Sequence, residues 1–293
     1  MPITDLSVYR DDRYPSCWID DKSGYPDRIA SFLKSKGLRV LNADQLRDFM
    51  INGINDGKAY DKLVVFSQDI VPVTVTEDYL ANTTFREYLD AGGSVFWIGD
   101  IPLFYIGKQD KVIDHAWQRG STLFMLGIVP VFADSPEKTV IITREGKKLG
   151  LNHRWSGRRP ILNDSGVKVL AESEGLICYS YVEVPKPRQP SLTERITSAL
   201  KRVKAEVAVP YIKGSFELEF HPPPEKPPEG KTARIVSPRA PAFHERNINA
   251  WMKNYSEAHP DSGFFRIWDY DPRHLTDAML KELYDIVKRI SEK

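Results

Sequence analysis

The chain has 293 residues, of which 41% are hydrophobic and 28% charged, and its formal net charge is +1. These values are those of a globular protein with a large core, and the net charge gives no indication of a nucleic-acid-binding or membrane-binding surface. No apolar run approaches the roughly 18–20 residues of a membrane-spanning helix, and residues 1–5 lack the pattern of a signal peptide. Because the two cysteines, Cys17 and Cys178, are far apart, we expect free thiols and a cytoplasmic location.

The first part of the chain alternates between short apolar runs and helical patterns. We expect a strand at 6–9, a long polar loop, and a helix that begins at Pro26. A second strand is expected at 38–41. The next helix has Asn42 or Asp44 as its N-cap and an apolar stripe at positions 46, 49, 50 and 54.

A strand–helix–strand unit follows and places the first candidate site. The apolar runs 63–66 and 94–98 are joined by a helix, as in two neighbouring strands of a parallel sheet. Ligands bind at the carboxyl ends of such strands. Five residues directly follow these two runs and are therefore candidates for ligand binding: Ser67, Gln68, Asp69, Gly99 and Asp100.

The remaining elements complete the expected fold. The pattern predicts one or two helices in 109–126, and strands at 129–132, 139–142, 167–170 and 177–182. Residues 185–232 are expected to form an inserted Pro-rich and helical arm, either a peripheral element or a lid or docking arm. Strands at 248–255 and 264–270 are expected to form a C-terminal β-hairpin, followed by a helix from Thr276 or Asp277. We therefore predict a single α/β domain, 1–293, with a flavodoxin-like, doubly wound, mostly parallel sheet.

Two carboxylates are the candidates for catalysis. Asp100 follows a buried strand, so it is interpreted as a base, as a partner of a sugar hydroxyl, or as the cap of the next turn. Together with Asp69 it has the groups for acid–base chemistry, or for a divalent cation, if the two strands are adjacent. The alternative is an ordinary loop of turn residues.

Aromatic and basic residues supply further candidates for binding. Trp18, in the loop after the first strand, is a candidate stacking surface or a loop-packing residue. Arg154 and Arg158 belong to a basic-aromatic cluster that is suited to a phosphate or a carboxylate, or that is simply a solvated loop. Arg266, in an otherwise apolar strand, is either a functional charge or half of a structural Arg–Asp pair.

Residues 60–97, with the sequence Asp90-Ala91-Gly92-Gly93 before the second apolar run, resemble the class I glutamine amidotransferase-like superfamily, in its ThuA-like and β-galactosidase-trimerisation-like branches. The resemblance covers about 5–105 and the final helix, and it implies a flavodoxin-like scaffold and a pocket at the strand ends. True amidotransferases place a Cys in a Gly-x-Cys-x-Gly turn and a His-x-Glu pair late in the chain. Here the turn reads Ile98-Gly99-Asp100, and no His-x-Glu occurs, so the resemblance does not imply a thiol mechanism.

We therefore expect a binding or regulatory module for a small polar ligand, such as a sugar or nucleotide. A hydrolase or isomerase that uses Asp100 and Asp69 is one alternative. A protein-interaction subunit that uses the 185–232 arm is the other, and self-association is left open. Since the chain has no HxH, HExxH, Walker or GxGxxG pattern, no metal or cofactor is expected. Neither a membrane nor a nucleic acid is an expected partner.

Overall fold

The structure is a computed structural model that describes residues 2–14, 24–77, 82–108, 111–115, 121–128, 138–157, 159–161, 166–174, 246–269 and 275–292. These residues belong to one compact unit, formed from 1–182 and 244–293. The predicted arm at 185–232 and the predicted strands at 129–132 and 177–182 lie outside the described residues, as do Trp18 and Arg158.

An eight-stranded sheet forms the centre of this unit, in the order β2-β1-β3-β5-β13-β12-β11-β9. The first five strands are parallel, and the last three are added antiparallel. The strands of this sheet are β1 (Asp5–Tyr9), β2 (Arg39–Leu41), β3 (Lys62–Phe66), β5 (Ser94–Ile98), β9 (Ile141–Ile142), β11 (Lys168–Glu174), β12 (Arg246–Lys253) and β13 (Phe264–Ile267). The prediction of an α/β protein with a mostly parallel central sheet is confirmed.

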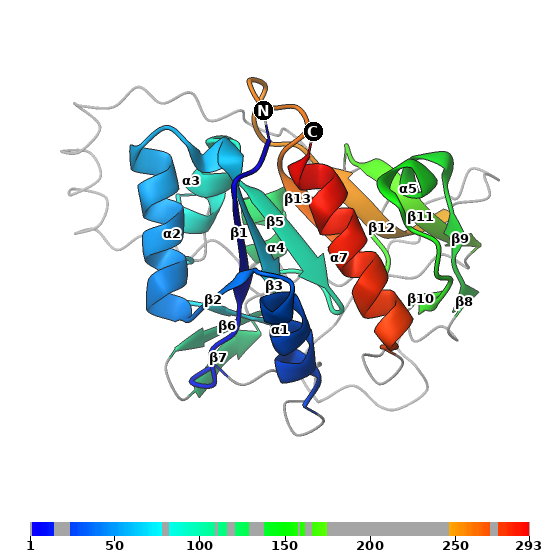
Figure 1. Ribbon diagram of the computed structural model, residues 1–293, viewed down its shortest axis with the longest axis horizontal. Helices are drawn as coiled ribbons and strands as arrows, with labels where there is room; N and C mark the ends of the chain where they lie inside the picture. Colours follow the sequence, from blue (N-terminus) through cyan, green and yellow to red (C-terminus); the bar gives the residue numbers. More distant parts are fainter. Residues whose placement is uncertain are drawn as a thin grey trace, which may run out of the picture. The chain divides into compact units, whose positions relative to one another are not determined.

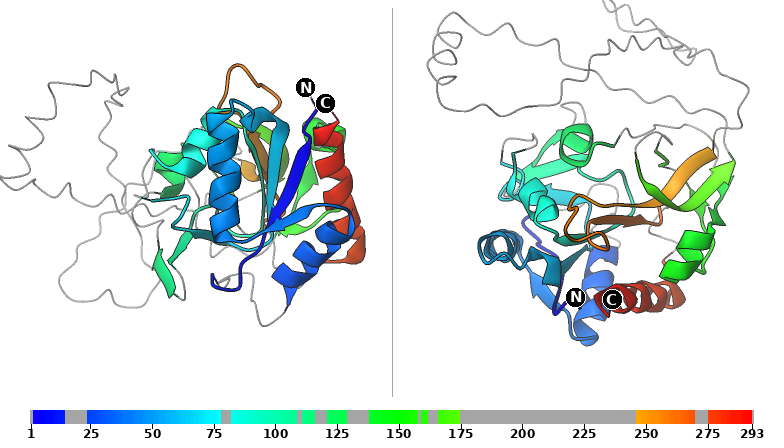
Figure 2. Two further views of the ribbon diagram at one scale, coloured as in Figure 1. Left: turned by 60° about the vertical axis from the view of Figure 1, so that its left-hand side comes forward. Right: turned by 90° about the horizontal axis from the view of Figure 1, so that it is seen from above.

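Helices cover both faces of the sheet (Figures 1 and 2). They are α1 (Tyr25–Ser35), α2 (Ala43–Asn55), α3 (Thr84–Asp90), α4 (Ser121–Leu126), α5 (Arg144–Leu149) and α7 (Asp277–Ser291), with a short 3₁₀ helix, η2 (Ala59–Asp61). Apolar side chains of α2, α3 and α4 share one core cluster with Phe66, Trp97 and Phe264. Those of α1, α5 and α7 pack on the other face with Phe96 and Phe265. Burial of both faces explains the continuous apolar runs of the parallel strands.

Local sequence sets where the helices begin. The Asn42 side chain accepts a hydrogen bond from the Gln45 N–H, and the Gln45 side chain accepts one from the Asn42 N–H, so α2 begins with a capping box. Pro26 lies in the first turn of α1, where its missing N–H costs no hydrogen bond. Thr276 caps α7 by accepting from the Met279 N–H. All three helices begin at or within one residue of the predicted positions.

Two predictions of secondary structure are corrected. Residues 109–126 contain α4 but also β7 (Lys111–His115), which pairs with β6 (Tyr105–Lys108) and extends the small sheet begun by β4 (Ile70–Pro72). The adjacent β-branched residues Val112 and Ile113 favour this strand. The strand predicted at 139–142 is split, because β8 (Lys138–Thr139) pairs with β10 (Ser156–Gly157) while β9 pairs with β11.

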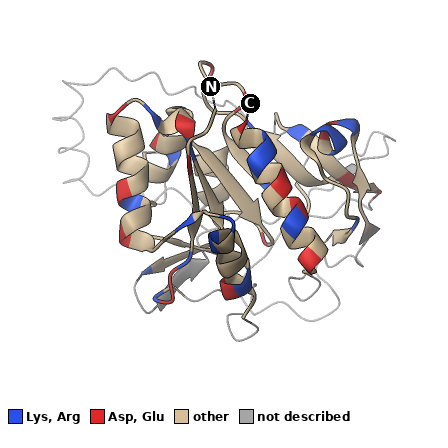
Figure 3. Cartoon of the chain, in the orientation of Figure 1, with Lys and Arg blue, Asp and Glu red and all other residues tan. Residues whose placement is uncertain are grey.

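The surface charges of the helices are mixed. Figure 3 shows acidic and basic residues interspersed along α7, and both kinds are present on α2. Within the described ranges, no helix is both long enough and apolar enough to cross a membrane.

Candidate functional site

Three carboxylates follow three adjacent parallel strands at the carboxyl edge of the sheet, which is the edge at which β3, β5 and β13 end. Ile98 of β5 pairs with Ile267 of β13, so Asp100 and Asp269 occupy equivalent positions beyond the two strands. Asp69 follows β3, the neighbour of β5 on its other side. The side chains are buried, with exposed fractions of 0%, 3% and 0% for Asp69, Asp100 and Asp269. The edge therefore holds buried acids rather than an open row of carboxylates.

Asp100 is held by an ion pair and by the turn that it begins. Its Oδ1 accepts hydrogen bonds from Nε of Arg159 at 3.2 Å and from the N–H of Ile101 at 2.7 Å. The indole of Trp97 donates to the Asp100 carbonyl at 2.8 Å. Burial raises the pKa of Asp100 above its ordinary value, and the charges of Arg159 and Arg266 oppose that shift. Asp100 both caps the turn and faces a cation.

Asp269 joins three segments of the chain. Its Oδ1 accepts a hydrogen bond from the Trp155 indole at 2.7 Å. Its Oδ2 accepts from the Arg159 N–H at 2.8 Å and from Nδ2 of Asn249 at 2.7 Å. Burial raises the pKa of Asp269, against the opposing charge of Arg266. Through these contacts Asp269 fixes the 155–159 segment to the end of β13.

Arg266 is fully buried beneath this edge. Its Nη2 donates to the Gly99 carbonyl at 3.0 Å, and its Nη1 donates to the Arg159 carbonyl. Burial lowers the pKa of Arg266, while the charges of Asp269 and Asp100 raise it. The two acids and Arg266 are buried, and Arg159 is part-exposed, so two carboxylates and two guanidinium groups balance one another, as a buried charge requires.

Ser67 and Gln68 close the crevice between β1 and β3, the point at which the strand order reverses. The Ser67 hydroxyl donates to the Tyr9 carbonyl at 2.8 Å. Gln68 Oε1 accepts from the Asp11 N–H at 2.8 Å and from Arg10 Nη1 at 3.1 Å. Ser67 is therefore engaged by the last residue of β1, and Gln68 by the loop that follows β1.

A hollow of about 390 Å³ lies where the 153–156 segment meets the start of α7. We call it the Arg154 hollow. It is lined by Thr139, His153, Arg154, Trp155, Ser156, Thr276 and Met279. Arg154 is exposed, and it makes no hydrogen bond or ion pair with any residue that the structure describes. Among the predicted basic residues that the structure describes, Arg154 is the one that lines a hollow. Hydroxyl groups and the Trp155 indole line the same hollow.

Glu282 of α7 holds the segment that carries Arg154. Its nearly buried carboxylate accepts hydrogen bonds from the N–H groups of Asn152 at 3.0 Å and His153 at 3.1 Å. The same carboxylate lies 2.5 Å from Nδ1 of His153. The sequence indicates no role for Glu282 or Asn249, because their partners are distant in the chain. Glu282 binds Asn152, 130 residues away, and Asn249 binds Asp269, 20 residues away. Asn249 does lie within the predicted strand at 248–255.

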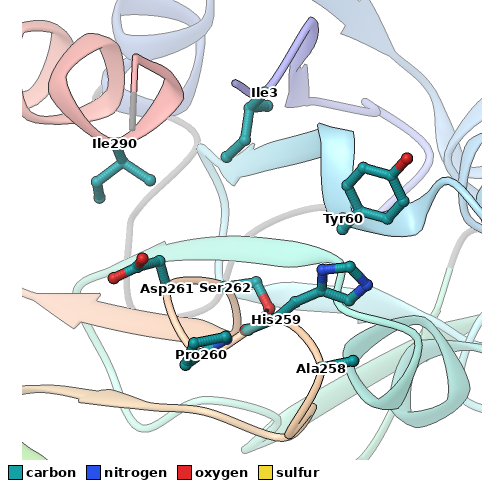
Figure 4. A pocket seen from close by; sticks show the side chains of 8 residues that line it. All are labelled: Ile3, Tyr60, Ala258, His259, Pro260, Asp261, Ser262 and Ile290. Atoms are coloured by element: carbon teal, nitrogen blue, oxygen red, sulfur yellow. Dashed lines mark hydrogen bonds between the residues drawn. The ribbon is translucent and has the colours of Figure 1, made fainter. Parts of the chain in front are cut away.

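A second hollow, of about 200 Å³, lies at the opposite edge of the sheet (Figure 4). The loop between β12 and β13 supplies His259, Asp261 and Ser262 to one side of it. The His259 ring stacks on Tyr60, with ring centres 4.5 Å apart and planes 17° apart. None of the predicted site residues that the structure describes lines this hollow.

No set of three or more His, Cys, Asp or Glu side chains lies close enough to hold a metal ion in the part of the chain that the structure describes. The divalent-cation interpretation of Asp69 and Asp100 gains no support from their positions.

Comparison with known proteins gives a family and no activity. A model of the MJECL34 family matches residues 4–184, more than half of the chain. The uncharacterized protein MJECL34 of Methanocaldococcus jannaschii is 35% identical over 109 residues, which are 36% of this chain and 35% of that protein. The chain thus spans about a third of the length of the curated relative it matches. No solved structure matches. The extent of the family match shows that the chain belongs to the MJECL34 family.

Proposed function

We propose that this chain binds a small, polar, anionic molecule, such as a sugar phosphate or a nucleotide, in the Arg154 hollow. It acts as a binding or regulatory module and catalyses no reaction there. The observation that carries the proposal is the exposed guanidinium of Arg154, which has no partner among the described residues, at the rim of a 390 Å³ hollow. A guanidinium that is free to form paired hydrogen bonds favours phosphate and carboxylate groups.

The groups around Arg154 fit such a ligand. The hydroxyls of Thr139 and Ser156 line the hollow and are suited to hydrogen bonds with a sugar. Thr276 lies at the N-terminus of the 15-residue helix α7, where the helix dipole favours a negative charge. Trp155 adds an aromatic wall. The site therefore combines charge, hydroxyl groups and an apolar surface, as pockets for small polar ligands do.

The buried network supplies the rigidity that the proposed site needs. Asp269 holds Trp155, and Glu282 holds His153, on the two sides of Arg154. A binding residue flanked by fixed neighbours loses less conformational freedom when its ligand binds. Asp269 and Glu282 are thus positioning residues in this proposal.

The scaffold is proposed to be flavodoxin-like and related to the amidotransferase-like superfamily without its thiol. The parallel strands, numbered by their order along the chain, are arranged 2-1-3-4-5, the order of flavodoxin-like sheets. The turn after β5 carries Gly99 and Asp100, where an amidotransferase has its Cys. The burial of Asp69 and Asp100 favours a binding protein over the alternative hydrolase or isomerase, because a catalytic acid or base must reach the substrate. The interaction-subunit alternative depends on the 185–232 arm, which lies outside the described residues.

Calorimetric titration with AMP and ribose 5-phosphate, with adenosine as the uncharged comparison, tests the proposal. We expect both phosphates to bind and adenosine to bind much more weakly. Arg154→Ala should weaken phosphate binding about tenfold to a hundredfold, since a hydrogen bond to a charged group contributes about 1.5–3 kcal/mol. Arg47→Ala, which removes an exposed arginine from α2, is the matched control and should leave binding unchanged. Equal affinities for wild type and Arg154→Ala would overturn the proposal.

A further inference from the structure

Two cations share one aromatic ring on the face of the sheet covered by α3 and α4. The guanidinium carbon of Arg86, on α3, lies 4.8 Å from the centre of the Tyr255 ring. Nζ of Lys253, the last residue of β12, lies 5.8 Å from the same ring centre. Lys253 pairs with Phe264 at the start of β13, so this cluster lies at the opposite end of β13 from Asp269. It is therefore distinct from the Arg154 hollow.

Part of the cluster has a structural role at the end of α4. Arg86 donates to the Met125 carbonyl at 3.1 Å, and the Tyr255 hydroxyl donates to the Leu126 carbonyl at 2.8 Å. Lys253 donates to the Gly127 carbonyl at 2.8 Å. These contacts satisfy carbonyls that a helix end leaves without intrahelical partners. They use only one of the three N–H donors of the Lys253 ammonium.

The charge of Lys253 is not compensated within the cluster. Arg86 has a carboxylate partner, because its Nε lies 2.8 Å from Oδ1 of Asp90. Across the described ranges, Lys253 makes no ion pair. Burial lowers the pKa of Lys253, and the nearby charge of Arg86 lowers it further. A bound anion would offset the repulsion between the Lys253 and Arg86 charges, so we expect the cluster to attract an anion.

A hollow of about 340 Å³ opens beside both cations, and we call it the Lys253 hollow. Arg86, Lys253, Tyr255 and Gly127 line it, and Glu257 lines it as an exposed acid. Glu257 forms no ion pair with Lys253 and acts only to repel anions that approach its side of the hollow. The space is larger than a phosphate group alone, so a phosphate ester fits as well as the free ion.

We propose that the Lys253 hollow is a second anion site, in which Arg86 and Lys253 bind the phosphate group of a small molecule. The Lys253 ammonium would contribute its two remaining donors, and Arg86 would contribute Nη2, because its Nε and Nη1 already donate to Asp90 and to the Met125 carbonyl. Both groups are charged, so these would be charge-assisted hydrogen bonds. The proposal is independent of the one for the Arg154 hollow, because no described residue lines both hollows.

Calorimetry with inorganic phosphate at low ionic strength tests this site. The Lys253→Gln variant keeps a donor for the Gly127 carbonyl but removes the charge, and it should weaken binding at this site by about tenfold or more. Lys288→Gln, at an exposed position on α7, is the matched control and should bind as the wild type does. Arg154→Ala removes the other proposed site and should leave the phosphate binding that Lys253→Gln weakens. A titration with glycerol 3-phosphate distinguishes a phosphate ester from the free ion as the preferred occupant.

A measurement on the wild-type protein covers the case in which Lys253→Gln does not fold. The Nζ resonance of Lys253, followed by NMR, should shift with phosphate and saturate along the calorimetric curve. The proposal is overturned if this resonance does not move, or if a folded Lys253→Gln protein binds phosphate as the wild type does.

Discussion

The indole N–H of Trp155 donates a 2.7 Å hydrogen bond to Oδ1 of Asp269, although 114 residues separate the two in the chain. Asp269 is fully buried and accepts two further hydrogen bonds through Oδ2. One carboxylate therefore fixes the end of β13 to the segment that carries Arg154.

Replacing this carboxylate by an amide is predicted to destabilise the protein. In Asp269→Asn an NH₂ group faces at least one of the N–H donors that now bind an oxygen, which leaves buried donors unpaired. We expect the free energy of unfolding to fall by about 2–4 kcal/mol, as measured by urea denaturation. Asp277→Asn, at a carboxylate that is 91% exposed, is the control and should change it by less than about 1 kcal/mol. Equal stabilities for the two variants would contradict the role assigned to Asp269.

Arg266 is predicted to be necessary for folding stability rather than for contact with the ligand. Arg266→Met leaves Asp100 and Asp269 buried without that counter-charge and frees the Gly99 carbonyl. We expect a loss of about 3–5 kcal/mol in the free energy of unfolding. Arg39→Met removes an arginine that pairs with Asp5 at the surface, and it should cost no more than about 1 kcal/mol. A fully stable Arg266→Met protein would show that the buried network is not needed.

The raised pKa of Asp100 gives a pH dependence of defined sign. At pH values between the ordinary value of 3.8 and the raised folded value, the folded protein holds a proton that the unfolded chain has lost. Stability from this group is therefore present below about pH 4 and is lost as the pH rises through the folded pKa. The stability of the wild type minus that of Asp100→Asn should decrease as the pH rises above 4. An increase over that range would contradict the assigned direction.

Asp11 is predicted to show the opposite dependence. Burial raises its pKa, but hydrogen bonds from the Arg13 side chain and from the N–H groups of Ala43 and Arg13 outweigh burial and lower it. Its contribution is present above the ordinary value of 3.8 and is lost as the pH falls through the lowered folded value. Denaturation of wild type and Asp11→Asn at several pH values should show the two stabilities converging in acid. A constant difference would argue against the lowered pKa.

Much of the sheet could be predicted because its signals are local. The runs 63–66 and 94–98 are apolar on both faces, which identifies buried parallel strands. The two candidate caps, Asn42 and Asp44, mark the start of α2, and Asn42 is the one that caps it. Because Asp69 and Asp100 come soon after these runs, the sequence also predicted that both lie at the carboxyl edge of the sheet.

The site was harder to predict because its contacts are distant in sequence. Nothing near Asp100 indicates that Arg159 pairs with it across 59 residues, or that both Asp69 and Asp100 are buried. The predicted strand at 139–142 is divided at Val140, whose N–H donates to the Trp155 carbonyl. No local sequence pattern predicts this contact. Turn chemistry predicts where a side chain lies along the chain, but its exposure depends on which segments pack over it.

An NMR titration of the wild-type protein with AMP, followed at the Trp155 indole N–H and assigned with Trp155→Phe, tests whether a phosphate binds in the Arg154 hollow. The indole lines the Arg154 hollow and is held by Asp269, so its resonance reports binding at that place. We expect the indole and Arg154 resonances to shift together and saturate in the wild type, and the indole resonance no longer to respond in Arg154→Ala. If AMP leaves both resonances unmoved, or moves the indole resonance equally in Arg154→Ala, AMP does not bind through Arg154 in this hollow.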